Sequence, residues 1–151
     1  MRYYPYEEFL RDIKKLAKEV ADFDTYVAVA RGGLTPAHFL AEANDIRRVY
    51  ALSSIGYDGR KKLGRPIISQ IPDLKDARNI LIVEDIVDSG DTLIEVLKAL
   101  RSRYPQKRFA TAALFYKESA KLRPDFFVQY ADEWIDFFWT RDINGSDDRQ
   151  L

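Results

Sequence analysis

The chain has 151 residues, which suits one domain with a substantial hydrophobic core. Lys plus Arg and Asp plus Glu each number 24, so the net charge is zero, which argues against a nucleic-acid-binding protein. The sequence has no cysteine, which excludes disulfides, thiolate nucleophiles and cysteine-based zinc sites. It has neither a signal-peptide core nor an apolar run of membrane-spanning length, so we expect a cytoplasmic protein with no membrane span.

The first half of the chain alternates helix-like and strand-like segments. Helical spacing of apolar residues, or a capping residue before a proline, predicts two helices, Pro5–Phe23 and Thr35–Asn44. In the second helix, Thr35 is the expected N-cap and Pro36 the first helical residue. Short apolar runs predict three strands, Tyr26–Ala30, Val49–Ser53 and Ile67–Ile71. Between the last two, Ser54–Pro66 is rich in glycine and basic residues and predicts a surface loop or an edge hairpin.

The second half continues the alternation. Strands are predicted at Asn79–Val83 and Phe109–Phe115, a helix at Asp91–Tyr104, and short extended pieces at Phe126–Tyr130 and Trp134–Trp139. This order predicts an α/β fold, a mostly parallel twisted sheet flanked by helices on both faces. We expect residues 1–143 to form one domain and residues 144–151 a polar, mobile tail.

The segment Ile80–Thr92, ILIVEDIVDSGDT, is the most informative in the chain. An apolar strand leads directly into the adjacent carboxylates Glu84 and Asp85, which repel each other unless cations or hydroxyl donors face them. A ribose diol and Mg²⁺ would supply both. Asp88 follows, and then residues 89–92 offer hydroxyls and backbone N–H groups at a helix start, which favour a phosphate. A polar loop that merely caps the helix is the alternative.

A second loop, Arg31-Gly32-Gly33-Leu34, also follows an apolar strand and is expected at the same edge of the sheet. Its glycines let backbone N–H groups approach a ligand closely, and Arg31 adds a permanent positive charge. The pair suits a pyrophosphate, although a tight strand-to-helix turn explains the same residues.

These motifs resemble those of the type I phosphoribosyltransferases. VEDIVDSGDT is similar to the phosphoribosyl-pyrophosphate motif of that family, with Glu84 in place of the more usual aspartate. Asp91 occupies a variable position, and an acid there is unusual beside a phosphate. The stretch RGGLTPAHFLAE resembles the pyrophosphate loop of bacterial xanthine-guanine phosphoribosyltransferases, in which the peptide bond before the second loop residue, here Arg31–Gly32, can be cis. The implied fold is a single domain with a small hood and a flexible lid loop, and Ser54–Pro66 is the candidate lid.

The resemblance also implies a purine site. Lys117, after the predicted strand ending in LFYK, matches the lysine that donates to a purine 6-oxygen, although a strand end often carries an exposed lysine. Trp134 and Ile135 match a Trp-Ile-acid segment that packs on the base and offers backbone carbonyls. Core packing is the alternative for Trp134. Asp136 is a further candidate near the metal.

The resemblance therefore implies purine salvage. The reaction is Mg²⁺-dependent transfer of ribose 5-phosphate from phosphoribosyl pyrophosphate to guanine, xanthine or hypoxanthine, giving a nucleoside monophosphate and pyrophosphate. Asp88 is the expected general acid/base, and Glu84 and Asp85 are the expected metal and ribose ligands. The expected phosphoribosyl-pyrophosphate site comprises Arg31, Gly32, Glu84, Asp85, Val87, Asp88, Ser89, Gly90, Asp91 and Thr92. A transferase for another base and a non-catalytic nucleotide sensor are the alternatives. A homodimer or homotetramer is expected.

Overall fold

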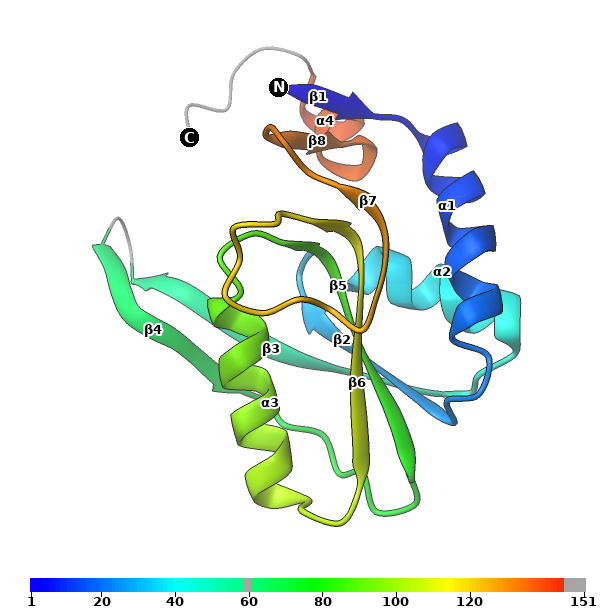
Figure 1. Ribbon diagram of the computed structural model, residues 1–151, viewed down its shortest axis with the longest axis vertical. Helices are drawn as coiled ribbons and strands as arrows, with labels where there is room; N and C mark the ends of the chain where they lie inside the picture. The colour runs from blue at the N-terminus through cyan, green and yellow to red at the C-terminus, as the bar shows by residue number, and fades with distance from the viewer. Residues whose placement is uncertain (59–60, 146–151) are drawn as a thin grey trace.

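The computed structural model describes residues 1–58 and 61–145. Its centre is a six-stranded sheet in the order β4-β3-β2-β5-β6-β7 (Figure 1). Five of these strands, β3, β2, β5, β6 and β7, run parallel to one another. The edge strand β4 is antiparallel to β3. The strand bounds are β2 Thr25–Ala30, β3 Arg48–Asp58, β4 Lys61–Ser69, β5 Asn79–Val87, β6 Arg108–Tyr116 and β7 Phe126–Tyr130. The predicted α/β class and mostly parallel sheet are confirmed.

Helices cover both faces of the sheet, as the predicted crossovers require (Figure 1). On one face α1 (Tyr6–Glu19) and α2 (Leu34–Asn44) pack in a core with Ala28, Leu81 and Val83. On the other face α3 (Asp91–Arg103) packs in a second core with Val27 and Ile82. Successive residues of β2 and β5 thus enter different cores, which explains why these strands are apolar throughout and do not alternate.

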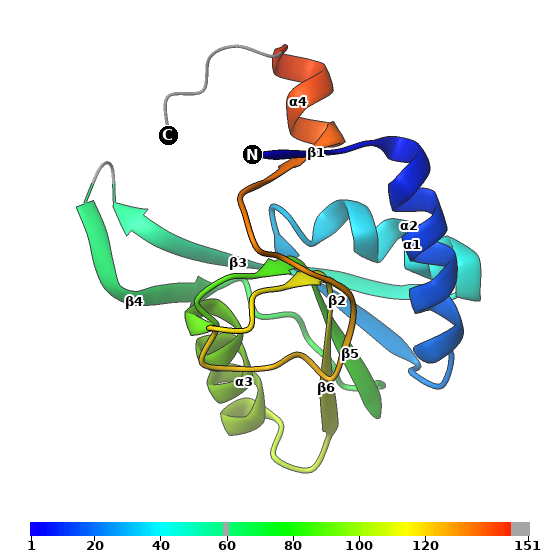
Figure 2. The same ribbon diagram turned by 45° about the horizontal axis from the view of Figure 1, so that its top comes forward.

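A second, two-stranded sheet sits above the carboxyl end of the main one and forms a hood (Figure 2). It pairs β1 (Arg2–Tyr4) in parallel with β8 (Ile135–Phe137), so the two ends of the described chain lie side by side. The last helix, α4 (Phe138–Asn144), completes the hood. The sequence predicted neither β1 nor α4, and its extended piece Trp134–Trp139 is wrong beyond Phe137.

Two further expectations need correction. Ser54–Pro66 is not a loop where it is described, because β3 and β4 extend through it as an edge hairpin in which Ile55 faces Ile67. The hairpin alternative is therefore confirmed, while residues 59–60 of the candidate lid lie outside the described part. Thr35 is not an N-cap: α2 already begins at Leu34, and Gly33 precedes it.

The expected tail, residues 144–151, is described only at its start. Asn144 is the last residue of α4, and residues 146–151 lie outside the described ranges. None of the helices in residues 1–58 and 61–145 combines the length and the apolar character that a membrane crossing demands.

Candidate functional site

The loops after β2 and β5 lie together because these strands are parallel neighbours in the sheet. The hood stands opposite them, and the two enclose a pocket of about 890 Å³. The predicted site residues that line this pocket come from both sides: Arg31, Gly32, Asp85, Asp88, Lys117, Trp134, Ile135 and Asp136. Residues far apart in the sequence therefore meet in one cleft, as a two-substrate site requires.

Gly32 packs directly against the carboxylate of Asp85. A Cβ atom at position 32 would lie 2.2 Å from Asp85 Oδ2, so only glycine fits there without displacement of the acid. The neighbouring Gly33 is equally confined, since its Cβ would lie 2.2 Å from the carbonyl oxygen of Val83. The loop has a cis peptide bond, but between Ala30 and Arg31, one residue earlier than the bond that the resemblance indicated.

Glu84 and Asp85 form a half-buried pair of acids near the end of β5. Burial, together with the charge of Asp85, raises the pKa of Glu84 well above its ordinary value. Burial raises the pKa of Asp85 to about 6, although the backbone N–H of Ile86 donates to its Oδ1 at 2.7 Å. Of the two carboxylates, only that of Asp85 lines the pocket.

This acid pair fits a divalent cation. Within residues 1–58 and 61–145, neither Glu84 nor Asp85 forms an ion pair with a Lys or Arg side chain. No cluster of three potential metal ligands occurs in the same ranges. Mg²⁺ is commonly held by one or two carboxylates, with substrate phosphates and water completing its shell, so the two acids suit that ion.

The predicted phosphate loop begins α3, beside the pocket. Gly90 adopts a positive φ of 88°, and a Cβ atom there would lie 2.8 Å from the backbone nitrogen of Leu122. Ser89 Oγ accepts the backbone N–H of Asp91 at 3.2 Å, and Thr92 follows in the first turn of the helix. Val87 has a buried side chain that packs in the core beneath, so its side chain does not reach the pocket.

The unusual acid in this loop, Asp91, has a cationic partner. Lys121 Nζ lies 2.8 Å from Asp91 Oδ1, and the backbone N–H of Lys121 donates to the carbonyl oxygen of Ser89 at 2.8 Å. The segment after β6 therefore supports the loop and also places a positive charge on its acid. The pairing explains how a carboxylate can stand at a candidate phosphate site.

The predicted purine residues also line the pocket. Lys117 Nζ lies 3.4 Å from Asp88 Oδ1, and both side chains are exposed to solvent. Trp134 is 56% exposed in the hood and lines the pocket, so it is not a core residue. Ile135 is buried, but its segment forms the wall.

Asp136 is ion-paired with Arg141 of α4. A cation is therefore already present at the third acid that the sequence indicated for a metal. Asp88 instead pairs with Lys117, and neither Glu84 nor Asp85 forms an ion pair within residues 1–58 and 61–145.

Sequence reasoning missed Lys121 and Arg141. Lys121 stands four residues after Lys117, in the connection that follows β6. The signals that could have indicated its pairing were the acid Asp91 at a helix start and the two lysines in this connection. Arg141 lines the pocket and pairs with Asp136 from the first helical turns after β8. Its role depends on α4, which the sequence did not predict.

Comparison with known proteins places this geometry in a family. Residues 2–143 match the phosphoribosyl transferase domain. The solved structure of Helicobacter pylori xanthine-guanine-hypoxanthine phosphoribosyltransferase is similar, with a TM-score of 0.87, 44% identity and coverage of 94% of this chain and 95% of that one. The solved structure of the purine phosphoribosyltransferase of Pyrococcus horikoshii is also similar. Its TM-score is 0.77 and its identity is 32%, and the match covers 91% of this chain and 92% of that one. The xanthine-guanine phosphoribosyltransferase of Desulfotalea psychrophila is 34% identical over 145 residues, covering 91% of this chain and 86% of that protein.

Proposed function

Because this chain belongs to the phosphoribosyl transferase family, we propose that its pocket transfers ribose 5-phosphate from phosphoribosyl pyrophosphate to a 6-oxopurine. The products are a purine nucleoside 5′-monophosphate and pyrophosphate, so the enzyme serves purine salvage. Relatives that cover most of the chain are xanthine-guanine phosphoribosyltransferases. The observation that carries the proposal is the meeting of Asp85, the Arg31-Gly32 loop and Lys117 in one pocket.

One half of the site would hold phosphoribosyl pyrophosphate. The start of α3, with Ser89, Gly90 and Thr92, would bind the 5-phosphate through hydroxyls, backbone N–H groups and the helix dipole. Glu84 and Asp85 would hold the ribose hydroxyls. Departure of pyrophosphate leaves positive charge on the ribose ring, which carboxylates favour. The guanidinium of Arg31 would stabilise the negative leaving group from the facing loop.

The other half would select and position the base. Lys117 can only donate hydrogen bonds, so it favours an oxygen at C6 over an amino group and would exclude adenine. Trp134 offers a ring face for the base. Asp88 lies at the pocket wall next to Lys117 and would exchange the proton at N7 of the purine as general acid/base, a role typically worth about 10²–10⁴-fold in rate.

Enzymes of this family use a metal ion, generally Mg²⁺. In this chain Asp85 and Glu84 are its candidate ligands, since within the described residues they form no ion pair, unlike Asp88, Asp91 and Asp136. When bound, the ion would offset charge on the pyrophosphate. Chelation of divalent cations with EDTA should therefore abolish turnover, and added Mg²⁺ should restore it.

Two other functions remain to be tested against this one. A transferase for another base would use the same acid pair, and a nucleotide sensor would bind ligands without turnover. The purified chain should be incubated with Mg²⁺, phosphoribosyl pyrophosphate and radiolabelled guanine, xanthine, hypoxanthine, adenine or uracil. Labelled monophosphate from the three 6-oxopurines, and not from adenine or uracil, is the expected result. Product from adenine or uracil would favour another base, and binding without product would favour the sensor.

A further inference from the structure

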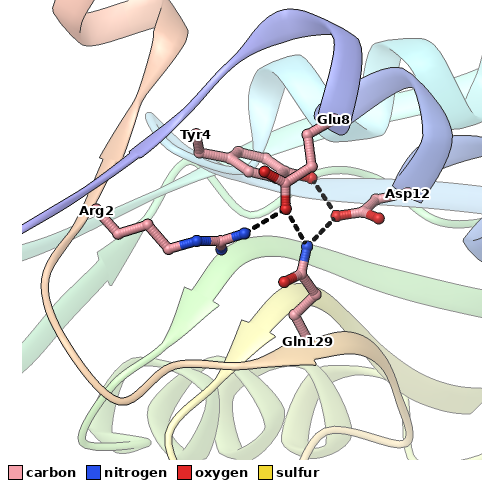
Figure 3. A network of polar contacts seen from close by, with 5 residues as sticks. All are labelled: Arg2, Tyr4, Glu8, Asp12 and Gln129. Atoms are coloured by element: carbon pink, nitrogen blue, oxygen red, sulfur yellow. Dashed lines mark hydrogen bonds and ion pairs between the residues drawn. The ribbon is translucent and has the colours of Figure 1, made fainter.

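A polar network outside the pocket joins three separate elements beneath the hood (Figure 3). Its members are Arg2 and Tyr4 of β1, Glu8 and Asp12 of α1, and Gln129 of β7. The hydroxyl of Tyr4 donates to Asp12 Oδ2 at 2.7 Å. Gln129 Nε2 lies 2.7 Å from Asp12 Oδ2 and 2.7 Å from Glu8 Oε2, and Arg2 pairs with Glu8. The network therefore ties the hood strand β1 to the main body of the domain.

Asp12 depends on this network because it is only 4% exposed. Within residues 1–58 and 61–145 its side chain accepts hydrogen bonds from Tyr4 and Gln129 and forms no ion pair with Lys or Arg. A buried carboxylate is costly unless its oxygens are satisfied. Burial of the Tyr4 ring and its bond to Asp12 raise the pKa of Tyr4, so its hydroxyl stays a donor at neutral pH.

The same tyrosine contacts both the hood and the main sheet. Its ring packs edge-on against Phe137 of the hood at 5.8 Å and against Phe115 of β6 at 4.8 Å. Phe115 stands two residues before Lys117. Two residues before Tyr4 in β1, the backbone N–H of Arg2 donates to the carbonyl oxygen of Trp134 at 2.8 Å. Tyr4 thus lies between the wall that carries Trp134 and the strand that carries Lys117.

We propose that the bonds of Tyr4, Asp12 and Gln129 set the distance between Trp134 and Lys117, and thereby the affinity for the purine base. None of the three lines the pocket, so they are positioning residues. The phosphoribosyl-pyrophosphate half is instead built on β2, β5 and α3 of the main domain. The inference rests on the proposed function and adds a determinant of base affinity to it.

Tyr4→Phe is the decisive variant because it removes one hydroxyl and keeps the ring. Asp12 then lacks a donor, and a shift of β1 toward solvent would satisfy it with water. We expect the KM for guanine to rise about tenfold, which corresponds to about 1.4 kcal/mol of binding free energy. The KM for phosphoribosyl pyrophosphate should stay unchanged. Gln129→Met, which removes the second donor at similar volume, should give the same split and serves if Tyr4→Phe does not fold.

Tyr26→Phe is the matched control. Tyr26 is also fully buried, and its hydroxyl donates to the carbonyl oxygen of Val20 at 3.0 Å and accepts from Asn44 at 2.8 Å. The Tyr26→Phe variant also loses a buried hydroxyl, but from the body of the domain, away from the hood. The stability of this variant should fall, while its KM values for guanine and for phosphoribosyl pyrophosphate stay at the wild-type level. A rise in guanine KM equal to that of Tyr4→Phe would overturn the proposal, because general loosening would then explain both.

Fluorescence adds a test that needs no turnover. The sequence has two tryptophans, Trp134 and Trp139, and both lie in or beside the hood. The emission maximum should shift in Tyr4→Phe and Gln129→Met and stay constant in Tyr26→Phe. Unshifted emission with an unchanged guanine KM in both network variants would refute the inference. A wild-type protein that turns over no base would instead refute the proposed function, and the emission shifts would still decide whether the network places the hood.

Discussion

A Cβ atom on Gly32 would lie 2.2 Å from Oδ2 of Asp85, far inside any allowed contact distance. The pyrophosphate loop and the acid strand are thus fitted to each other at this one point. In Gly32→Ala the added methyl must displace either the loop or the carboxylate. A misplacement of about 1 Å can cost about 10²-fold in rate, so we expect kcat/KM for phosphoribosyl pyrophosphate to fall by about that factor.

Ser102→Ala is the control for this variant, since it is a small change at an exposed position of α3 outside the pocket. It should keep wild-type kcat/KM. Wild-type activity in Gly32→Ala would show that the contact between Gly32 and Asp85 is not required for the reaction.

Asp88→Asn tests the assigned general acid/base. The amide keeps the size of the side chain but cannot exchange a proton in the same way, so we expect kcat to fall by about 10²–10⁴-fold. The KM for phosphoribosyl pyrophosphate should change little. Steady-state kinetics with guanine gives both values, and Glu118→Gln, at an exposed acid outside the pocket, is the control. Unchanged kcat would remove Asp88 from the mechanism.

The ion pair between Lys121 and Asp91 predicts a rescue. Lys121→Ala removes a positive charge from an acid beside the candidate 5-phosphate site, so the KM for phosphoribosyl pyrophosphate should rise about tenfold. Asp91→Ala in the same chain removes the repulsion and should recover most of that loss. Both variants and the double variant form a double-mutant cycle. Independent, additive effects would show that the pair does not act on the phosphate.

Asp24 predicts a pH-dependent contribution to stability. Burial raises the pKa of Asp24, but hydrogen bonds from the backbone N–H of Asn79, the Thr25 hydroxyl and the backbone N–H of Arg78 outweigh it, and the net pKa is lowered. A carboxyl whose pKa is lower in the folded state stabilises the fold above its unfolded pKa, and this stabilisation is lost as the pH falls through the folded value.

Asp24→Asn should therefore be less stable than the wild type at pH 7, and the difference should shrink as the pH falls below about 4. Urea unfolding at a series of pH values measures it. A difference that is constant with pH would mean that the charge of Asp24 plays no part.

The parts of the site that could be predicted are those with local signals. An apolar run that ends in Glu84 and Asp85, and a glycine pair after Ala30, are visible within a few residues because a buried strand and its loop differ sharply in polarity. The hairpin of β3 and β4 was harder to predict. Gly56 and Gly64 lower the strand propensity of its sequence, and the pairing of Ile55 with Ile67 is a tertiary contact that the local sequence does not show.

The hood could not be predicted for a related reason. Phe137, Phe138 and Trp139 have high strand propensity, and packing of their rings on one another and on Phe9 decides that two of them begin a helix. The three residues of β1 carry too short a pattern to detect. Likewise, Lys121, which pairs with Asp91, is thirty residues away in the sequence. The local sequence therefore could not show why the phosphate loop tolerates an acid at position 91.

The pairing of β1 with β8 also has a consequence for the order in which the protein is made. A ribosome releases Arg2 first among the hood residues, yet its partner Ile135 emerges only after the main sheet has been synthesised. Closing so long a loop is slow and entropically costly compared with the local β5–α3 contacts. The sugar-phosphate half of the cleft can therefore form during synthesis, whereas the wall that faces the base is assembled last.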